Sequence, residues 1–278
     1  TIISKLVKGA KNSKRPSAIL SFNPHPRQFF AREFDRYQII SEINKVKKLK
    51  ELGVDNFFSL TFDASIANLT PKEFIEKIII QKMKVDKLIV GYDFRFGKDR
   101  KGDTLLLQDY SSIHGFSLEI INPIKEKKTK EIFSSTSIRT AINSGDISKA
   151  NFFLGYNWRM EGVIIEGSKR ARQINFPTAN MIPHDQIYPL KGVYAIQSLF
   201  DGQLYNGIAN FGERPTIEGK KILLETHLFD FNEDIYGKQL TVQFLTFIRK
   251  EKKFESFALL AEQIKKDTQT VRKYFKEK

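Results

Sequence analysis

The sequence contains no cysteine, and it has only one tryptophan, three methionines and four histidines. The lack of cysteine excludes disulfides, thiolate nucleophiles and cysteine-based metal sites. No apolar run reaches the roughly 20 residues that a membrane-spanning helix needs. The first residues, Thr1–Lys5, also lack the charged and then apolar pattern of a signal peptide. These absences predict a cytoplasmic protein that has no membrane partner.

Acidic residues are in the minority: 32 Asp and Glu stand against 46 Lys and Arg, which gives a formal net charge of +14. Such an excess is typical of nucleic-acid-binding proteins. Here, however, lysines recur in helix-like segments such as Lys45–Lys50, and acids are interleaved with them. Aromatic and basic residues do not alternate along one recognisable groove. The pattern favours solvated helix faces and attraction of polyphosphate ligands, and nucleic-acid binding without catalysis is the alternative.

Strand-like and helix-like segments alternate in residues 1–150. Helical patterns occur at Ser41–Leu52 and at Thr70–Lys82, where Thr70, Pro71 and Glu73 form a capped helix start. The apolar segments that we interpret as strands are Ser17–Phe22, Asn56–Leu60, Lys87–Gly91 and Leu118–Ile121. This alternation predicts an α/β domain with a doubly wound parallel sheet, whose ligands lie beyond the carboxyl ends of the strands.

Residues 151–278 have a different pattern. Helices over Ser137–Leu154, broken at Ser144–Asp146, connect the two halves. Short β-type runs then follow, and a helix is expected from about Phe257 to Phe275. The β-type runs are Glu161–Glu166, Gly192–Leu199, Gln203–Asn210, Lys221–Phe229 and Gln239–Arg249. Several strands at short spacing predict a closed antiparallel barrel with a terminal helix.

The segment Asn175–Asn180 has the strongest chemical signature. A basic, glycine-led stretch, Gly167–Arg172, precedes it, and such a loop can surround phosphates with N–H groups and cations. The Thr178 hydroxyl and the Asn180 carbonyl are hard oxygen ligands suited to Mg²⁺. Glu225, within an apolar strand, can take a proton from a substrate hydroxyl. Singly these features fit a basic surface hairpin, a turn or a solvent-facing acid, but together they predict a small-molecule kinase without a P-loop.

Three places in the first half are candidate ligand contacts. His25 lies between two prolines after a strand, in a segment that the prolines stiffen. Asp93 follows another strand and could meet a nucleotide. Ser134–Arg139 is a hydroxyl-rich helix start that can bind phosphate through its N–H groups. A structural turn at His25 and simple N-capping at Ser134 are the alternatives.

Taken in order, these motifs resemble those of the prokaryotic bifunctional riboflavin kinases/FMN adenylyltransferases, or FAD synthetases, over essentially all 278 residues. In the second half the matching blocks are Gly167–Asn180, Leu190–Ala195, Gly207–Thr216, Glu225–Phe231, Tyr236–Lys238, Phe247–Phe254 and Gln263–Asp267. In the first half they are Phe22–Arg27, Val90–Gly97 with Gly102 and Asp103, and Ser134–Arg139.

For residues 151–278 the resemblance implies a six-stranded kinase barrel that transfers the γ-phosphate of ATP to the riboflavin 5′-hydroxyl and so makes FMN. It implies that Thr178 and Asn180 bind Mg²⁺ and that Glu225 is the general base. Arg249 and the terminal helix would form part of the flavin pocket. The other residues implied to bind ATP or flavin are Gly167, Lys169, Arg170, Arg172, Pro177, Asn210, Arg214 and Thr216.

For residues 1–150 the resemblance implies a nucleotidylyltransferase-like module that makes FAD and pyrophosphate from FMN and ATP. Asn23 and His25 would line the flavin side of its site. The residues implied to face ATP are Asp93, Ser135, Thr136 and Arg139. The resemblance leaves the oligomeric state open.

The sequence departs from the family pattern at two places. The family's first strand and its His-x-Gly-His segment would precede Thr1, and the printed sequence begins with what resembles the continuation of that helix, Ile2–Leu6. We therefore expect a whole kinase site beside an adenylyltransferase module that lacks its triphosphate cradle. Ala171 and Asn175 stand where the family usually has glycine, from which we expect weaker nucleotide binding at most. A flavin-binding module without catalysis is the remaining alternative.

Overall fold

The computed structural model describes residues 2–31, 36–166, 176–184, 186–216 and 219–277. The chain divides into two compact units. The first consists of Thr1–Tyr37 and Glu42–Phe133, and the second of Gln38–Ser41 and Ser134–Lys278. Among the described residues, no helix is both long enough and apolar enough to cross a membrane.

The first unit contains the predicted parallel strands. β1 (Ala18–Asn23) pairs with β2 (Asn56–Thr61), and β3 (Lys87–Gly91) pairs with β4 (Ser117–Ile121). Both pairings are parallel, and the helical segments lie between the strands in the chain. The α/β class predicted for this half is confirmed, with its described strands arranged as two pairs.

The helices of the first unit follow the capping signals in the sequence. At the predicted start of the second helix, the Thr70 hydroxyl accepts a bond of 3.2 Å from the Glu73 N–H, and the Glu73 carboxylate accepts one of 2.9 Å from the Thr70 N–H. A bond from Lys77 and those from Thr70 lower the pKa of Glu73 to about 2. The helical elements are α1 (Ile2–Ser13), α2 (Pro26–Phe30), α3 (Glu42–Glu51), α4 (Ala64–Ala67), α5 (Pro71–Glu73), a π-helix (Phe74–Lys82), a 3₁₀ turn (Lys98–Arg100) and α6 (Thr104–His114).

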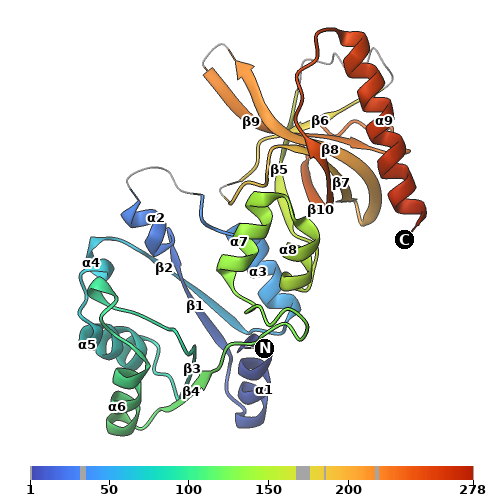
Figure 1. Ribbon diagram of the computed structural model, residues 1–278. Coiled ribbons are helices and arrows are strands. Elements are labelled where there is room, and N and C mark those ends of the chain that lie inside the picture. Colours follow the sequence, from blue (N-terminus) through green and yellow to red (C-terminus); the bar gives the residue numbers. More distant parts are fainter. Residues whose placement is uncertain (1, 32–35, 167–175, 185, 217–218, 278) are drawn as a thin grey trace. The chain divides into compact units, whose positions relative to one another are not determined.

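The second unit is the predicted six-stranded antiparallel barrel (Figure 1). Its strands close in the order β10-β5-β6-β9-β8-β7. Two helices, α7 (Ser135–Ser144) and α8 (Ile147–Leu154), precede it in the chain. The strands are β5 (Arg159–Ile165), β6 (Ala179–Met181), β7 (Gly192–Phe200), β8 (Gln203–Thr216), β9 (Gly219–Leu228) and β10 (Gln239–Lys250).

The barrel interior and the two preceding helices form one apolar core. Ile142 and Ile147 from the helices pack in the same cluster as Trp158 and Phe244 from the barrel segment, and all four side chains are buried. The Trp158 indole N–H donates to the Ile39 carbonyl at 2.7 Å, which satisfies the polar end of this large side chain.

The C-terminal helix α9 (Phe257–Lys276) packs on the outer face of the barrel (Figure 1). Its Val271 is fully buried against Val193 and Ala195 of β7, Ile208 of β8 and Phe229, which follows β9. The predicted terminal helix is thereby confirmed. A second apolar cluster, separate from the barrel interior, lies under this helix.

Gly162 in β5 provides a test of how tightly the barrel is packed. A Cβ at this position would lie 2.4 Å from Met181 Cγ and 2.5 Å from the Ile182 carbonyl oxygen. We expect Gly162→Ala to lower the free energy of unfolding by about 1–3 kcal/mol, as overpacking does. Urea unfolding followed by the fluorescence of Trp158, the single tryptophan, measures this change in the barrel unit.

The matched control is Gly9→Ala in α1, where a Cβ would meet no atom within 4 Å. That change should leave the Trp158 transition in place and can add up to about 1 kcal/mol of helix propensity. An unchanged urea midpoint in Gly162→Ala would contradict the packing described for β5 and β6.

Candidate active site

Residues from five neighbouring strands lie in one row across the outer face of the barrel. Residues that are Cα partners in an antiparallel ladder project to the same face of the sheet. Because the alternate positions Leu224 and Ala209 are in the barrel core, the row faces outward. In strand order the row is Asn180 (β6), Glu225 (β9), Asn210 (β8), Val193 (β7) and Arg249 (β10).

Glu225 is the centre of a network with Asn210, Arg214 and Glu251, here named the carboxylate network. Arg214 Nη2 forms an ion pair with Glu225 Oε2, while its Nη1 lies 3.0 Å from Glu251 Oε1. Asn210 Nδ2 donates to the same two oxygens, at 3.4 Å and 3.3 Å. Each donor therefore bridges two carboxylates.

The carboxylate network is partly shielded from water. The side chains of Arg214, Glu225 and Glu251 are 33%, 28% and 30% exposed. Burial acts to lower the pKa of Arg214, but the bonds to Glu225 and Glu251 outweigh it and hold the pKa above its ordinary value. The guanidinium is therefore a permanent cation next to Glu225.

Glu251 is a member of the network that the sequence did not single out. It lies directly after β10, two residues beyond Arg249. Its carboxylate sits over Gly212, where an added Cβ would come within 2.0 Å of Glu251 Oε1. The sequence signal for this contact was Gly212 in β8, because a strand glycine often marks the close approach of another group.

The segment before β6 is fastened to β9 by His227. The His227 ring stacks on Phe176 with centroids 3.7 Å apart, and its Nδ1 lies 2.8 Å from the Pro177 carbonyl oxygen. His227 is two residues beyond Glu225 on the same strand, so it shares the outward face. Thr178, the residue after Pro177, is thereby held beside the row.

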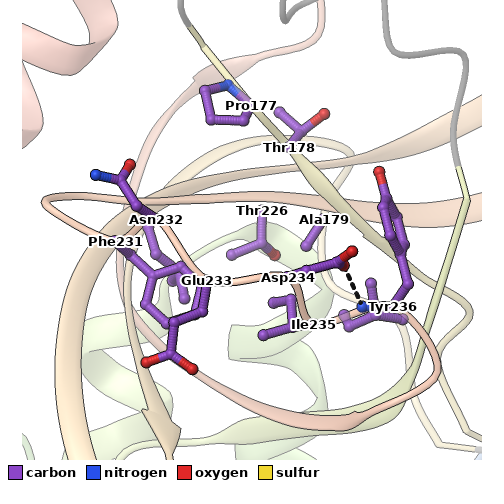
Figure 2. Close-up of a pocket in the computed structure, with 12 residues that line it drawn as sticks. Pro177, Thr178, Ala179, Thr226, Phe231, Asn232, Glu233, Asp234, Ile235 and Tyr236 are labelled. Carbon is purple, nitrogen blue, oxygen red and sulfur yellow. Dashed lines mark hydrogen bonds between the residues drawn. The ribbon is translucent and has the colours of Figure 1, made fainter.

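A pocket of about 340 Å³ adjoins Thr178 (Figure 2). The loop from Phe231 to Tyr236 curves around it, and the Asp234 carboxylate accepts a bond of 3.1 Å from the Tyr236 N–H. Acidic and amide side chains lie along its rim. Its apolar lining comes from Ile164, Pro177, Ala179, Leu228, Phe231, Ile235 and Tyr236. The sequence matched Tyr236 to a family block but did not indicate a pocket here.

At the other end of the row, Arg249 is bound to α9. Its Nε lies 3.0 Å from both carboxylate oxygens of Asp267, and its Nη2 lies 2.6 Å from one of them. The Asp267 side chain is only 6% exposed, and Gln263 donates to it at 2.8 Å. This bidentate pair joins β10 to the helix over the outer face.

The oxygen ligands available near Thr178 suit Mg²⁺. Asn180 is 6% exposed and lies in register with Glu225. A threonine hydroxyl and an amide carbonyl are hard, neutral ligands, and Mg²⁺ in phosphate sites typically combines one or two protein oxygens with phosphate oxygens. Within the described ranges, no three His, Asp or Glu side chains cluster as a metal site. A divalent ion held by Thr178, Asn180 and substrate phosphates fits these residues.

The residues predicted for adenylyl transfer belong to both units. In the first unit, Asn23 donates to Glu42 at 2.6 Å, and His25 Nδ1 accepts from the Arg27 N–H at 3.1 Å as the N-cap of α2. Asp93 is exposed in the turn after β3. In the second unit, Ser135 and Thr136 lie in the first turn of α7, whose N-cap is Ser134, and Arg139 lies at the start of its second turn.

The described residues do not include the predicted basic phosphate loop. Gly167, Lys169, Arg170 and Arg172, as well as Ala171 and Asn175, lie outside the described residues. For Thr216 only the backbone is described, which pairs with Gly219 at the end of the β8–β9 hairpin.

Comparison with known proteins identifies the family. The FAD synthetase family model matches residues 1–137, and the riboflavin kinase model matches residues 154–275. The bifunctional riboflavin kinase/FMN adenylyltransferase of Haemophilus influenzae is 38% identical over 99% of this chain and 89% of its own length. That of Bacillus subtilis is 35% identical over 93% of this chain and 82% of its own.

The fold is also shared with a solved structure. A crystal structure described as a macrolide-efflux protein from Streptococcus pneumoniae has a TM-score of 0.84 and 30% identity, and the match covers 98% of this chain and 88% of that one. The efflux description is that of the other protein. With both family models matched and two relatives similar over almost the whole chain, this chain belongs to the bifunctional riboflavin kinase/FMN adenylyltransferase family.

Proposed function

We propose that the chain makes FMN from riboflavin and ATP with its barrel unit, and that an FMN adenylyltransferase module makes FAD and pyrophosphate from FMN and ATP. Family membership supports both activities. The observation that carries the kinase assignment is the cross-strand register that sets Asn180, Glu225 and Asn210 side by side.

In the proposed kinase step, Glu225 is the general base. The 5′-oxygen of riboflavin attacks the γ-phosphorus of ATP, its proton passes to Glu225, and the bond from the γ-phosphorus to the β,γ-bridging oxygen breaks to release ADP. One carboxylate oxygen, Oε2, accepts bonds from Arg214 and Asn210. The other, Oε1, has no hydrogen-bond partner among the described residues, so it is the oxygen that would receive the proton.

Thr178 and Asn180 would hold Mg²⁺ and the phosphates next to this base. Bound Mg²⁺ would supply charge neutralisation for the transferring phosphoryl group. The pocket beside Thr178 is large enough for the nucleoside end of ATP, and its apolar walls with an acidic rim suit an adenine base and ribose hydroxyls. The basic stretch Gly167–Arg172 would contribute further phosphate contacts.

The flavin would extend from Glu225 toward Arg249. Neighbouring strands are about 4.8 Å apart, so four strand spacings set Asn180 and Arg249 at opposite ends of a row roughly 19 Å long, measured along the sheet. Val193 in this row is covered by Val271 of α9, so the flavin ring would lie along the edge of α9, which Asp267 fixes to Arg249.

For adenylyl transfer, Asn23 and His25 would contact the flavin, and Asp93, Ser135, Thr136 and Arg139 would contact ATP. The support is the match of residues 1–137 to the FAD synthetase model, which includes all of these residues except Arg139. A cytoplasmic location, where riboflavin and ATP are both present, fits these substrates.

The base assignment is tested by Glu225→Gln. Loss of the proton acceptor should reduce kcat for FMN formation by on the order of 10²–10⁴-fold, because general bases contribute that much. The substrate affinities should change little, so riboflavin binding followed by flavin fluorescence is the control. Turnover equal to that of the unchanged protein would remove Glu225 from the base role.

The metal assignment is tested with two matched threonines. Thr178→Val removes a proposed Mg²⁺ ligand and should raise the Mg²⁺ concentration for half-maximal kinase rate by on the order of tenfold. Thr270→Val is the control, because Thr270 is exposed on α9, away from the pocket lining, and its hydroxyl donates to the Lys266 carbonyl of the same helix at 3.0 Å. Equal Mg²⁺ dependence in the two variants would count against Thr178 as a ligand.

The attachment of Pro177 by His227 predicts a pH-dependent stability. Burial keeps the pKa of His227 below its ordinary value, outweighing the bond to the Pro177 carbonyl. The unfolded chain therefore takes up this proton more readily, and stability is lost as the pH falls below about 6.5 toward the lower folded-state value. His227→Gln should flatten the loss of unfolding free energy between about pH 7.5 and 5, read by Trp158 fluorescence.

His114→Gln is the control for that measurement, since His114 is exposed at the end of α6 in the other unit. In His114→Gln, the unfolding free energy should fall with decreasing pH as steeply as in the unchanged protein. An equal slope in His114→Gln and His227→Gln would show that His227 does not contribute.

A further inference from the structure

We propose that Glu251 is a positioning residue for phosphoryl transfer. It accepts a hydrogen bond from one Nη atom of Arg214 while Glu225 accepts one from the other, so that one oxygen of Glu225 remains available as the base. The proposal rests on the proposed role of Glu225 and extends it to a residue that does not touch the reacting atoms.

The hydrogen-bond pattern of Arg214 carries the argument. A guanidinium and a single carboxylate commonly form a bidentate pair, in which both carboxylate oxygens accept. In this structure the two Nη atoms have different acceptors: Nη1 donates to Glu251 Oε1 at 3.0 Å and to the Glu213 backbone carbonyl at 2.9 Å, whereas Nη2 donates to Glu225 Oε2. Since Arg214 shares its donors between two acids, Glu225 Oε1 is left without a partner among the described residues.

Asn210 repeats the same division. Its amide nitrogen lies 3.4 Å from Glu225 Oε2 and 3.3 Å from Glu251 Oε1. The two donors therefore converge on one oxygen of each acid. If the Glu251 carboxylate were absent, Glu225 would be the remaining acidic acceptor for Asn210 and Arg214 in the carboxylate network. The Glu213 carbonyl would keep one N–H of Arg214 Nη1, and the N–H now bound to Glu251 could pair with Glu225 Oε1, the oxygen needed for proton transfer.

The backbone is arranged to hold Glu251 in this place. Gly212 leaves the space that its carboxylate fills, because a Cβ there would lie 2.0 Å from Glu251 Oε1. Two residues earlier in the chain, Arg249 is fixed by its bidentate pair with the buried Asp267 of α9. The position of Glu251 is therefore set from both sides, by β8 and by the helix.

The charges of Arg214, Glu225 and Glu251 lead to the same conclusion, that Glu251 prevents Arg214 from pairing with Glu225 alone. Arg214 is a permanent cation in a partly buried site, and two carboxylates face it. With Glu251 neutralised, the attraction of the guanidinium falls on Glu225 alone. The tighter pairing would hold the base in a non-productive state without removing any group that binds ATP or riboflavin.

The experiment uses the full chain with saturating riboflavin, ATP and Mg²⁺, and compares Glu251→Gln with Glu255→Gln, an exposed acid four residues further on. Glu251→Gln should lower kcat for FMN formation about tenfold, a typical cost of a misplaced catalytic group, while KM for either substrate changes by less than about twofold. Glu255→Gln should behave as the unchanged protein. The urea midpoint followed by Trp158 should stay the same in both.

A double-variant cycle with Arg214→Gln then separates positioning from packing. If Glu251 acts through Arg214, adding Glu251→Gln to Arg214→Gln should lower kcat by less than about twofold further, so the two changes are strongly non-additive. The proposal is overturned if Glu251→Gln keeps full kcat, if its loss is the same in the Arg214→Gln background, or if the urea midpoint falls in proportion to activity. Retained activity in Glu225→Gln would instead overturn the base assignment.

Discussion

The register of the barrel strands is the constraint on which the candidate site depends. Leu224 and Thr226 face the barrel interior and are buried, so Glu225 between them must face outward. A slip of β9 by one residue would turn the carboxylate into the core and two buried side chains out of it, which the apolar core forbids. The packing of the interior thereby fixes the chemistry of the outer face, and the same argument sets Asn180 and Asn210 beside Glu225.

Although the chain has a formal net charge of +14, the arginines near this row are paired with acids. Arg214 lies between two acids in the carboxylate network, and Arg249 is bound to the buried Asp267. Both arginines therefore hold parts of the site in place. An arginine that is paired with an acid keeps the neighbouring side chains oriented. Phosphoryl transfer requires such orientation, because the reaction depends mainly on positioning and charge neutralisation.

Local signals in the sequence predicted most of the fold. The Thr70–Glu73 capping box and the β-type runs around Glu225 depend on residues close together in the chain, and the structure has them where expected. Glu251 and the pocket loop were not predicted, because their roles come from contacts with strands distant in the sequence. α6 was missed as well, since its signal is a modest one, an Asp103 cap and the left-handed Gly115 at its end. The chemical roles of Glu225, Thr178 and Asn180 stay predictions, and those of Lys169 and Arg170 fall outside the described residues.

In the proposed kinase site, Thr178 and Asn180 hold the metal on one side of the reacting hydroxyl, and Glu225 acts as the base on the other side. A crystal structure of the chain with riboflavin, Mg²⁺ and a non-hydrolysable ATP analogue measures this most directly. We expect the riboflavin 5′-oxygen at hydrogen-bond distance from Glu225, about 2.6–3.2 Å, with Mg²⁺ on Thr178, Asn180 and the phosphates. A metal ion bound elsewhere, or a 5′-hydroxyl turned away from Glu225, would contradict it.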